Sequence, residues 1–509
     1  MTNPRRERML VLGLIALYLA LNLLVLTRTP LMHSDESWLA GLTRNMLAQG
    51  KPGVTEPFFD LKPRYPHAIK ILFHLLQMPF LLIFGYHLFT VRLLSLLAGG
   101  LALYLFYRWC RQTAPMGLSL LCLAAAGLNG QFLAASHTAR QEVLLLCLLL
   151  GLAVYAGKHA ADLHTRHIVR LGLLTGLGAG LHPNGFLLVL GCGLGLLFIQ
   201  LGTKRVRIRA LLLYAAVTGL VALVFVFLSF QFDPQFPTHY RMYGETEFDL
   251  DAPAATRLAG FLPYLQKLWL GQSGTYLLPL MPPLLIGCAV LLLWGGIAAI
   301  HKPTPALLFP LGMVLGTMLG TALIGRYNQL SAILWMFPCL LLLAPLLRGI
   351  PRNRLVACTL ALAYGAAALP PMLQVLPHDY EAYLQKISTY IPADARTIAN
   401  LNTGFYFDND TLLDVRNLSY LKANNLTFAE YVRSRNVRYI LWSDEMDLIY
   451  RNRPTLNALY GNPRYVQEVE TFLRDHCVLL GTFTDDAYAA RLVQTFGTPC
   501  TVRAYRVLP

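Results

Sequence analysis

Charged side chains that could do chemistry gather in one stretch of this chain, residues 28–66. The stretch reads RTPLMHSDESWLAGLTRNMLAQGKPGVTEPFFDLKPRYP and follows a strongly apolar segment. Asp35 and Glu36 stand at the start of a predicted helix, and Lys62 and Arg64 stand near the end of the stretch. A carboxylate can accept a proton from a reacting hydroxyl group, and cations can stabilise a departing phosphate. We therefore predict that Asp35 and Glu36 are catalytic and that Lys62 and Arg64 bind phosphate.

Each pair also has a purely structural interpretation. Carboxylates in the first turn of a helix stabilise its positive end, which would be enough to explain Asp35 and Glu36. Successive helix residues point about 100° apart, so only one of the two is expected to face a central cavity. Lys62 and Arg64 could instead contact lipid headgroups beside the helix that follows them.

Further ionisable and polar residues fall at predicted turns between apolar segments, where a functional role is a fair expectation because such residues are costly at a membrane edge. We predict Arg326 as a third phosphate ligand and five supporting residues: His137, Arg140 and Glu142 in SHTARQE, His182 in HPNG, and Tyr327 in RYNQLS. An ion pair of Arg140 with Glu142 or Asp35 that fixes the fold is the competing interpretation. A helix-end cap would explain His182, and a lipid-facing anchor would explain Arg326.

The composition predicts a polytopic membrane protein. Of the 509 residues, 55% are hydrophobic and 14% are charged, and the mean hydropathy is +0.49, whereas soluble proteins carry about 25% charged residues. The net charge of +15 comes from residues 1–374, which hold 28 Lys and Arg against 12 Asp and Glu. Cytoplasmic basic loops and anionic membrane lipids explain this balance, so nucleic acid is not an expected partner.

Eleven segments are apolar enough to cross a membrane, which takes about 20 residues each. They lie near residues 9–27, 88–108, 115–133, 141–158, 168–182, 184–201, 210–230, 276–300, 306–325, 332–347 and 354–374. We interpret the first as a retained span because no small-residue cleavage site follows it. Basic residues of the loops fall mostly on one side, and ten of the twelve carboxylates before residue 375 fall on the other. The positive-inside rule then predicts a cytoplasmic N-terminus and two long outer loops, residues 28–87 and 231–275.

The first outer loop has to hold the candidate residues in place. Ser34 can cap a short helix that runs to about Gln49 and ends at Gly50. From residue 66 to residue 85 the chain is apolar, but polar residues recur every three or four positions, namely His67, Lys70, His74 and Gln77. One polar stripe of this kind predicts a helix that lies in the membrane interface and does not span it.

Residues 377–509 are less apolar than residues 1–376, the predicted transmembrane domain, and predict a separate α/β domain outside the membrane. Short strands are expected at ARTIANLN, TLLDV, VRYILWS, CVLLGTF and TVRAYRV, and a helix from Phe428 to Arg435. Cys477 and Cys500 lie in this domain and could pair in an oxidising compartment. The nine cysteines show no metal-ligand spacing and no nucleotide-binding loop is present. The sequence therefore requires no cofactor, although the acidic outer loops leave a divalent metal open.

The order of these motifs resembles a known family. It runs from a first span to the Asp35-Glu36 pair with its amphipathic helix, then Lys62-Pro63, an interfacial helix ending FG, Arg92, SHTARQE, HPNG and the late RY pair. This order is similar to the polyprenyl-phosphate-sugar-dependent membrane glycosyltransferases of the GT-C type, in particular the protein O-mannosyltransferase family 39 and the lipid A aminoarabinose transferases. The similarity covers most of residues 1–374, and LLDVRNLSY resembles the outer domain of bacterial members. Arg64 is a departure, since relatives show a second proline there.

The resemblance implies a mainly α-helical enzyme of the plasma (bacterial inner) membrane that moves a sugar from a polyprenyl-monophosphate carrier to a hydroxyl group of a lipid, protein or glycan acceptor. Asp35 matches the loop acid taken as catalytic, and Lys62 matches the phosphate-contacting lysine. Single displacement would invert the anomeric centre, while a retaining scheme with Asp35 and Glu142 stays open. A polymerase or ligase that uses a lipid-diphosphate donor, and a lipid or solute transporter, are the alternative functions.

Overall fold

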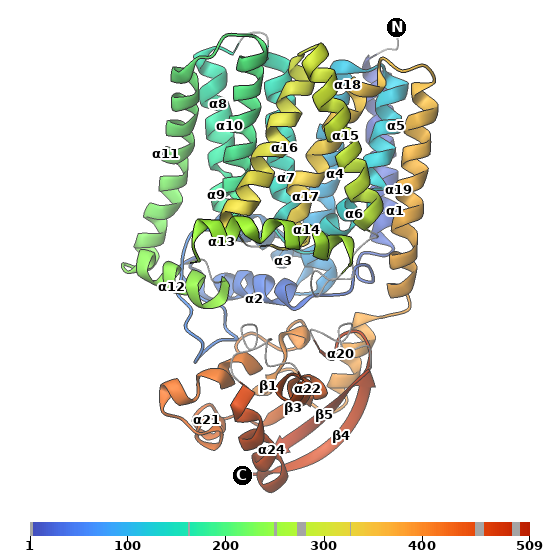
Figure 1. Cartoon of the computed structure of the whole chain (residues 1–509). Helices are drawn as coiled ribbons and strands as arrows, with labels where there is room; N and C mark the ends of the chain where they lie inside the picture. Colours follow the sequence, from blue (N-terminus) through green and yellow to red (C-terminus); the bar gives the residue numbers. More distant parts are fainter. Residues whose placement is uncertain are drawn as a thin grey trace.

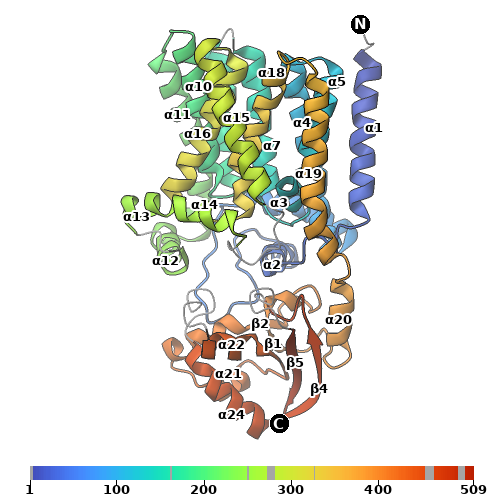
Figure 2. The same cartoon turned by 45° about the vertical axis from the view of Figure 1, so that its right-hand side comes forward.

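A bundle of long apolar helices and a smaller mixed α/β domain form the two ends of the molecule (Figure 1). The computed structural model describes residues 4–160, 163–248, 252–271, 281–325, 327–452, 463–490 and 499–509. The N-terminus lies at the end of the bundle that is remote from the C-terminal domain, in both views (Figures 1 and 2). The prediction of a polytopic membrane protein with a C-terminal α/β domain is confirmed.

Eight helical segments of the described chain are long and apolar enough to cross a membrane. They are α4 (Leu88–Thr113), α7 (Glu142–His159), α10 (Gly185–Gly202), α11 (Ile208–Phe232), α15 (Met281–His301), α16 (Pro305–Ile324), the run Leu330–Leu347 that includes α17 (Ile333–Cys339) and α18 (Leu343–Leu347), and α19 (Asn353–Val375), which continues into α20 (Tyr380–Ser388). A ninth is formed if α5 (Met116–Gly127) and α6 (Gly130–Ser136), bent by 66°, make one broken span.

The two remaining predicted spans correspond to shorter or more charged helices. α1 (Pro4–Leu23) begins with the charged run RRER and stands beside the bundle over most of its height (Figure 2). The segment near 168–182 is divided into α8 (Thr165–Gly176) and α9 (Gly178–Leu181). Each of the eleven predicted spans therefore matches a helix or a helix pair, of which eight or nine are long and apolar enough to cross by themselves.

Helices α10 and α16 pack through facing glycines. A Cβ atom on Gly316 would meet the backbone carbonyl oxygen of Leu190, and one on Gly312 would meet that of Leu194. Small residues let helix backbones approach closely, and van der Waals contact drives helix association where lipid removes the hydrophobic drive. This packing holds the α9–α10 turn close to the α16–α17 loop.

Short helices lie across the end of the bundle that faces the C-terminal domain. They are α2 (Ser34–Gln49), α12 (Phe236–Phe248), α13 (Ala254–Ala259) and α14 (Phe261–Trp269) (Figure 1), and α3 (Ile71–Phe84), which packs on α2. At 14 residues α3 is shorter than a span. Its polar stripe faces α2, where the Thr43 hydroxyl lies 2.8 Å from His74 Nδ1 and donates to Gln77 Oε1 at 2.5 Å.

The start of α2 differs by one residue from the sequence prediction. Ser34 is the first helical residue and His33 is the cap. The His33 ring accepts the N–H of Asp35 at 3.1 Å, and the Glu36 carboxylate accepts the N–H of His33 at 3.0 Å. The helix ends at Gly50 with φ +62°, as its glycine predicts.

The C-terminal domain is a five-stranded sheet in the order β2-β1-β3-β5-β4. Its strands are β1 (Thr397–Ala399), β2 (Leu412–Asp414), β3 (Tyr439–Ser443), β4 (Cys477–Asp485) and β5 (Cys500–Val507). β1 pairs in parallel with β2 and β3, while β5 runs antiparallel to β3 and β4. Around the sheet lie α20, η3 (Leu401–Thr403), η4 (Val415–Tyr420), η5 (Lys422–Asn424), α21 (Phe428–Ser434), α22 (Asp444–Asn452), η7 (Pro463–Tyr465) and α24 (Val466–His476). All five predicted strands and the helix at Phe428 are confirmed.

Cys477 and Cys500 do not pair. They stand at opposite ends of the β4–β5 ladder, where Cys477 faces Val507 and Cys500 faces Asp485, and both thiols are free. The disulfide that an oxidising compartment would have allowed is therefore excluded by strand register.

We expect Gly316→Ala to destabilise the bundle, because its methyl group would force α10 and α16 apart at a cost of about 1–3 kcal/mol. The matched control is Gly296→Ala in α15, where a Cβ atom meets nothing within 4 Å. The melting temperature Tm of the purified full-length protein in detergent should fall for the first variant and stay constant or rise for the second. Equal Tm values for the two variants would contradict the close packing.

Candidate active site

A buried ion pair anchors the first turn of α2. Glu36 and Arg92 of α4 are both fully buried, and two guanidinium nitrogens donate to the carboxylate at 2.7 and 2.8 Å. The Ala139 N–H donates to Glu36 Oε2 at 2.8 Å. The third Arg92 nitrogen binds the carbonyl oxygens of Leu26 and Pro30 at 2.8 and 2.9 Å. Both Glu36 oxygens are thus occupied by hydrogen bonds within the fold, which suits a positioning role better than the catalytic role predicted for it.

Asp35 lies at the edge of a second, connected network. Arg140 donates one nitrogen to Asp35 Oδ2, and its other two reach Glu142 at 3.1 and 3.3 Å. The side chain of Asp35 is 25% exposed, whereas Arg140 and Glu142 are 6% and 2% exposed. Both ion pairs considered for Arg140 thus exist on one guanidinium group. Asp35 is the member of this network that solvent or a ligand can reach.

The same network joins motifs that are far apart in sequence. Ser331 donates to Glu142 at 3.3 Å, and the side-chain amide of Asn184 donates to Ser331 at 2.9 Å. The ring of His182, which caps the end of α9, accepts the N–H of Asn184 at 3.0 Å. The SHTARQE, HPNG and RYNQLS motifs are therefore joined in the hydrogen-bond network that also holds Asp35.

Cations and aromatic rings form a second group around Trp38 of α2, which we call the Trp38 cluster (Trp38, Phe59, Lys62, Arg64 and Arg416). The rings of Trp38 and Phe59 meet edge to face with centroids 5.1 Å apart. Lys62 Nζ lies 5.4 Å from both centroids, and Arg64 Cζ lies 5.0 and 6.0 Å from them. Trp38 follows Asp35 by three residues on one helix face, so one turn of α2 carries both the predicted base and the ring that the predicted phosphate ligands contact.

Glu56 holds Arg64 in this cluster. Its carboxylate accepts two hydrogen bonds from Arg64, at 2.7 and 3.0 Å, and one from the Trp38 indole at 2.7 Å. Burial alone would raise the pKa of Glu56, but the charge and hydrogen bonds of Arg64 outweigh it and hold the pKa far below its usual range. Glu56 is therefore an anion at all physiological pH values.

A pocket beside the Trp38 cluster is lined by residues 63–67 and by α12. Tyr65 stacks on His239 with ring centroids 3.5 Å apart, and His239 binds Asp233 at 2.7 Å. Arg64 Cζ lies 4.5 Å from the ring centroid of Tyr243 and so borders both the cluster and this pocket.

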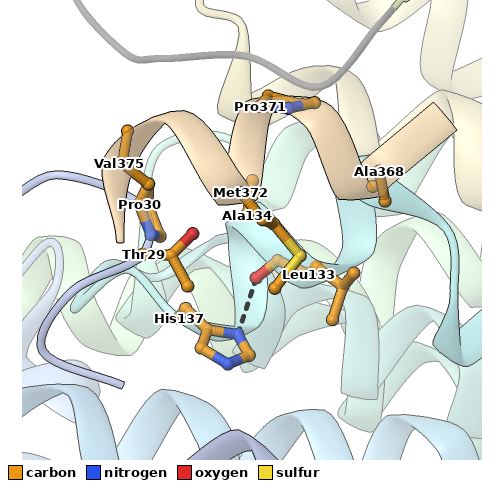
Figure 3. A pocket seen from close by; sticks show the side chains of 10 residues that line it. Thr29, Pro30, Leu133, Ala134, His137, Ala368, Pro371, Met372 and Val375 are labelled. Carbon is orange, nitrogen blue, oxygen red and sulfur yellow. Dashed lines mark hydrogen bonds between the residues drawn. The ribbon is translucent and has the colours of Figure 1, made fainter. Parts of the chain in front are cut away.

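The remaining predicted residues lie apart from these groups or outside the description. His137 lines an apolar pocket between α6 and α19, and its Nδ1 bonds to the Leu133 carbonyl oxygen at 2.8 Å (Figure 3). The Tyr327 hydroxyl donates to the Arg257 carbonyl oxygen, which fastens α13 to the α16–α17 loop. Arg326 lies outside the described residues.

Solved structures match the chain over most of its length, and three of them bear on its fold. ArnT from Cupriavidus metallidurans bound to undecaprenyl phosphate matches with a TM-score of 0.58 at 12% identity, covering 96% of this chain and 98% of that one. The archaeal oligosaccharyltransferase AglB from Archaeoglobus fulgidus, in complex with an inhibitory peptide and a dolichol-phosphate, matches with a TM-score of 0.52 at 12% identity, covering 90% and 72%. This chain has the GT-C fold of membrane glycosyltransferases.

The third match within this GT-C group is an oligosaccharyltransferase from Archaeoglobus fulgidus in complex with Zn and sulfate, with a TM-score of 0.51 at 12% identity, covering 94% and 72%. No protein-family model and no curated protein matches this chain by sequence. In the described part of the chain, no three His, Cys, Asp or Glu side chains come together as a metal site.

Three residues of the candidate site are not predicted from the sequence. Trp38 and Glu56 lie in the stretch that was singled out, but nothing in their spacing showed that both contact Arg64. The position of Trp38, three residues after Asp35, is the only local signal. Arg416 lies in the C-terminal domain, and no sequence pattern connects it to Lys62.

Glu36→Ala should lower the stability of the protein strongly, because it leaves the Arg92 guanidinium buried without its carboxylate, at a cost of about 3–5 kcal/mol. Asp379→Asn is the control, since Asp379 pairs with Arg28 on the surface and such pairs contribute about 0–1 kcal/mol. The measurement is Tm in detergent. An E36A protein as stable as the wild type but inactive would instead make Glu36 catalytic.

Arg64→Met should make stability depend on pH. The lowered pKa of Glu56 in the wild type means that its contribution is present above the unfolded pKa and is lost only in strong acid. Without Arg64, burial dominates and raises the pKa of Glu56, so stability should fall as pH rises through the neutral range. Tm measured from about pH 5 to about pH 8 should decline in the variant only. In the double variant R64M/E56Q, Tm should no longer fall as the pH rises. A fall that persists in the double variant would show that Glu56 is not the titrating group.

Proposed function

We propose that this chain is a glycosyltransferase of the plasma (bacterial inner) membrane that moves a sugar from a polyprenyl-monophosphate carrier to an acceptor hydroxyl group, with inversion. The observation that carries the proposal is the position of Asp35 on α2. It is the exposed member of a buried ion network, and it stands three residues before Trp38, whose ring is contacted by Lys62, Arg64 and Arg416. This combination offers a proton acceptor together with a binding site for a leaving phosphate. The sugar, and whether the acceptor is a lipid, a protein or a glycan, stay open.

The step needs a base and an anion site but no acid. Asp35 takes the proton of the acceptor hydroxyl group as its oxygen attacks the anomeric carbon. The bond from that carbon to the carrier phosphate breaks, and the phosphate leaves with the electron pair. Its charge grows during the step, so contacts from Lys62 and Arg64 are stronger in the transition state than in the ground state.

The contacts of Glu142 favour single displacement. A retaining scheme needs a second carboxylate with access to the sugar, on an element opposed to the first. Glu142 is 2% exposed, shares Arg140 with Asp35 and also binds Ser331. It therefore serves as the support of Arg140, and inversion is the expected outcome.

The comparisons support the class of donor. ArnT was crystallised with undecaprenyl phosphate and AglB was solved with a dolichol-phosphate, and both share the fold of this chain. By the charge of the loops, we place the N-terminus in the cytoplasm and the Trp38 cluster with the C-terminal domain at the outer face.

Asp35→Asn should lower the rate of sugar transfer by about 10²–10⁴-fold, because the amide cannot accept the acceptor proton. The measurement is transfer by the purified protein in nanodiscs, followed with a lipid extract as donor source. Expression and Tm should stay close to wild type, since Asp35 is partly exposed. Asp379→Asn is the control and should keep full activity, whereas activity retained in D35N would remove Asp35 as the base.

The donor class is tested on the same reaction. Mass spectrometry of the lipid released by the wild type should show a polyprenyl monophosphate. A released polyprenyl diphosphate would indicate a polymerase or ligase instead. Movement of lipid or solute across liposomes without any glycosidic transfer would support a transporter.

A further inference from the structure

Residues 414–417 of the C-terminal domain hydrogen-bond to the outer loop of the membrane domain. The Asn417 side-chain oxygen accepts the N–H groups of residues 60–62 at 3.2, 3.3 and 3.2 Å. Its amide donates to the Phe58 carbonyl oxygen at 2.8 Å, and the Asp414 N–H donates to the same oxygen at 3.1 Å. These bonds fix the backbone of the segment that carries Lys62.

Arg416, which belongs to the same segment, contacts both rings of the Trp38 cluster. Its Cζ lies 4.6 Å from the Trp38 centroid and 4.8 Å from that of Phe59, and its side chain is 4% exposed. Its Nε donates to Asp414 at 2.6 Å. Its Nη2 is buried and has no hydrogen-bond partner among the residues that the structure describes.

A buried cationic N–H group without a partner is costly, and folded proteins satisfy nearly all such groups. The cost points to a ligand that accepts this hydrogen bond. The cationic groups of Arg416, Lys62 and Arg64 all lie within 6.0 Å of the Phe59 centroid. Glu56 pairs with Arg64 and Asp414 pairs with Arg416. Three cations therefore stand against two carboxylates around the two rings, and the remaining positive charge favours an anionic ligand. The planar guanidinium fork suits phosphate oxygens in particular.

We propose that Arg416 is a third phosphate-binding cation, which the C-terminal domain supplies to the site of Lys62 and Arg64. The inference rests on the proposed function for the identity of the ligand, the phosphate headgroup of a lipid carrier. It gives the C-terminal domain a direct part in donor binding. The domain sets the backbone position of Lys62 through Asn417 and adds its own charge through Arg416.

The test uses the full-length protein in nanodiscs of neutral lipid and three probes, namely a polyprenyl monophosphate, the uncharged polyprenol and inorganic phosphate. Arg416→Gln should weaken the dissociation constant Kd for the polyprenyl monophosphate by about 10-fold or more, the size expected for a charge-assisted hydrogen bond. Binding of the polyprenol should not change. Competition by inorganic phosphate would show that the headgroup alone is recognised, and its absence would show that the lipid chain is also needed.

Arg435→Gln is the matched control. Arg435 belongs to the same domain and contacts the same loop through Asp60 at 2.5 Å, but it lies outside the Trp38 cluster. We expect its Kd to stay within about twofold of wild type. Arg416→Lys keeps the charge without the planar fork and should bind with an intermediate Kd. If R416Q has a lowered Tm, the other two variants decide the question. Wild-type affinity in R416K, together with a loss of affinity in R435Q as large as that in R416Q, would leave Arg416 a structural role only.

The two proposals fail in different ways. Wild-type carrier affinity in a folded R416Q protein that still transfers sugar would overturn the role of Arg416 and leave the transferase intact. The opposite result is a wild type that binds the carrier but transfers no sugar, with R416Q unable to bind the carrier. It would uphold Arg416 as a phosphate ligand and overturn the transferase.

Discussion

The arrangement of the site depends on one buried ion pair, Glu36 with Arg92. Two full charges removed from water are tolerated only when they are paired and hydrogen-bonded, and here four backbone groups complete the set. The pair ties α2 to α4 and to the turn that precedes it. Glu36 and Ala139 are the sequence neighbours of Asp35 and Arg140, so anchoring the first two residues brings the last two into contact.

Burial divides the carboxylates of the site by role. The almost fully buried ones hold arginines in place, as Glu142 does for Arg140 and Glu56 does for Arg64. Asp35 keeps a quarter of its side chain accessible. An active base has to reach its substrate, and the residues that support it have to exclude water so that their interactions stay strong. The glycine contacts between α10 and α16 in turn hold in place the loops that carry the HPNG and RYNQLS motifs.

The C-terminal domain is joined to the membrane domain at the site itself. Its contacts fall on α2 and on the loop of residues 58–62, which carry Asp35 and Lys62. A domain that only covered the site would have no need to hold the backbone at Lys62 or to place an arginine against two aromatic rings. The position of the C-terminal domain and the backbone of the loop that carries Lys62 are thereby linked through a few hydrogen bonds.

The sequence by itself determined the helices of the bundle, of which eight or nine are long and apolar enough to span. It also determined the five strands of the outer domain and the start and end of α2 to within one residue, and it pointed to the stretch that carries Asp35, Lys62 and Arg64. These depend on local patterns of apolarity, caps and charge. Only the tertiary structure separated Glu36 from Asp35, because two adjacent carboxylates look alike until Arg92 is seen to bind one of them. It also excluded the disulfide and brought Asn417 to Lys62 across 355 residues. Contacts of that range depend on how two domains pack, and no local pattern encodes them.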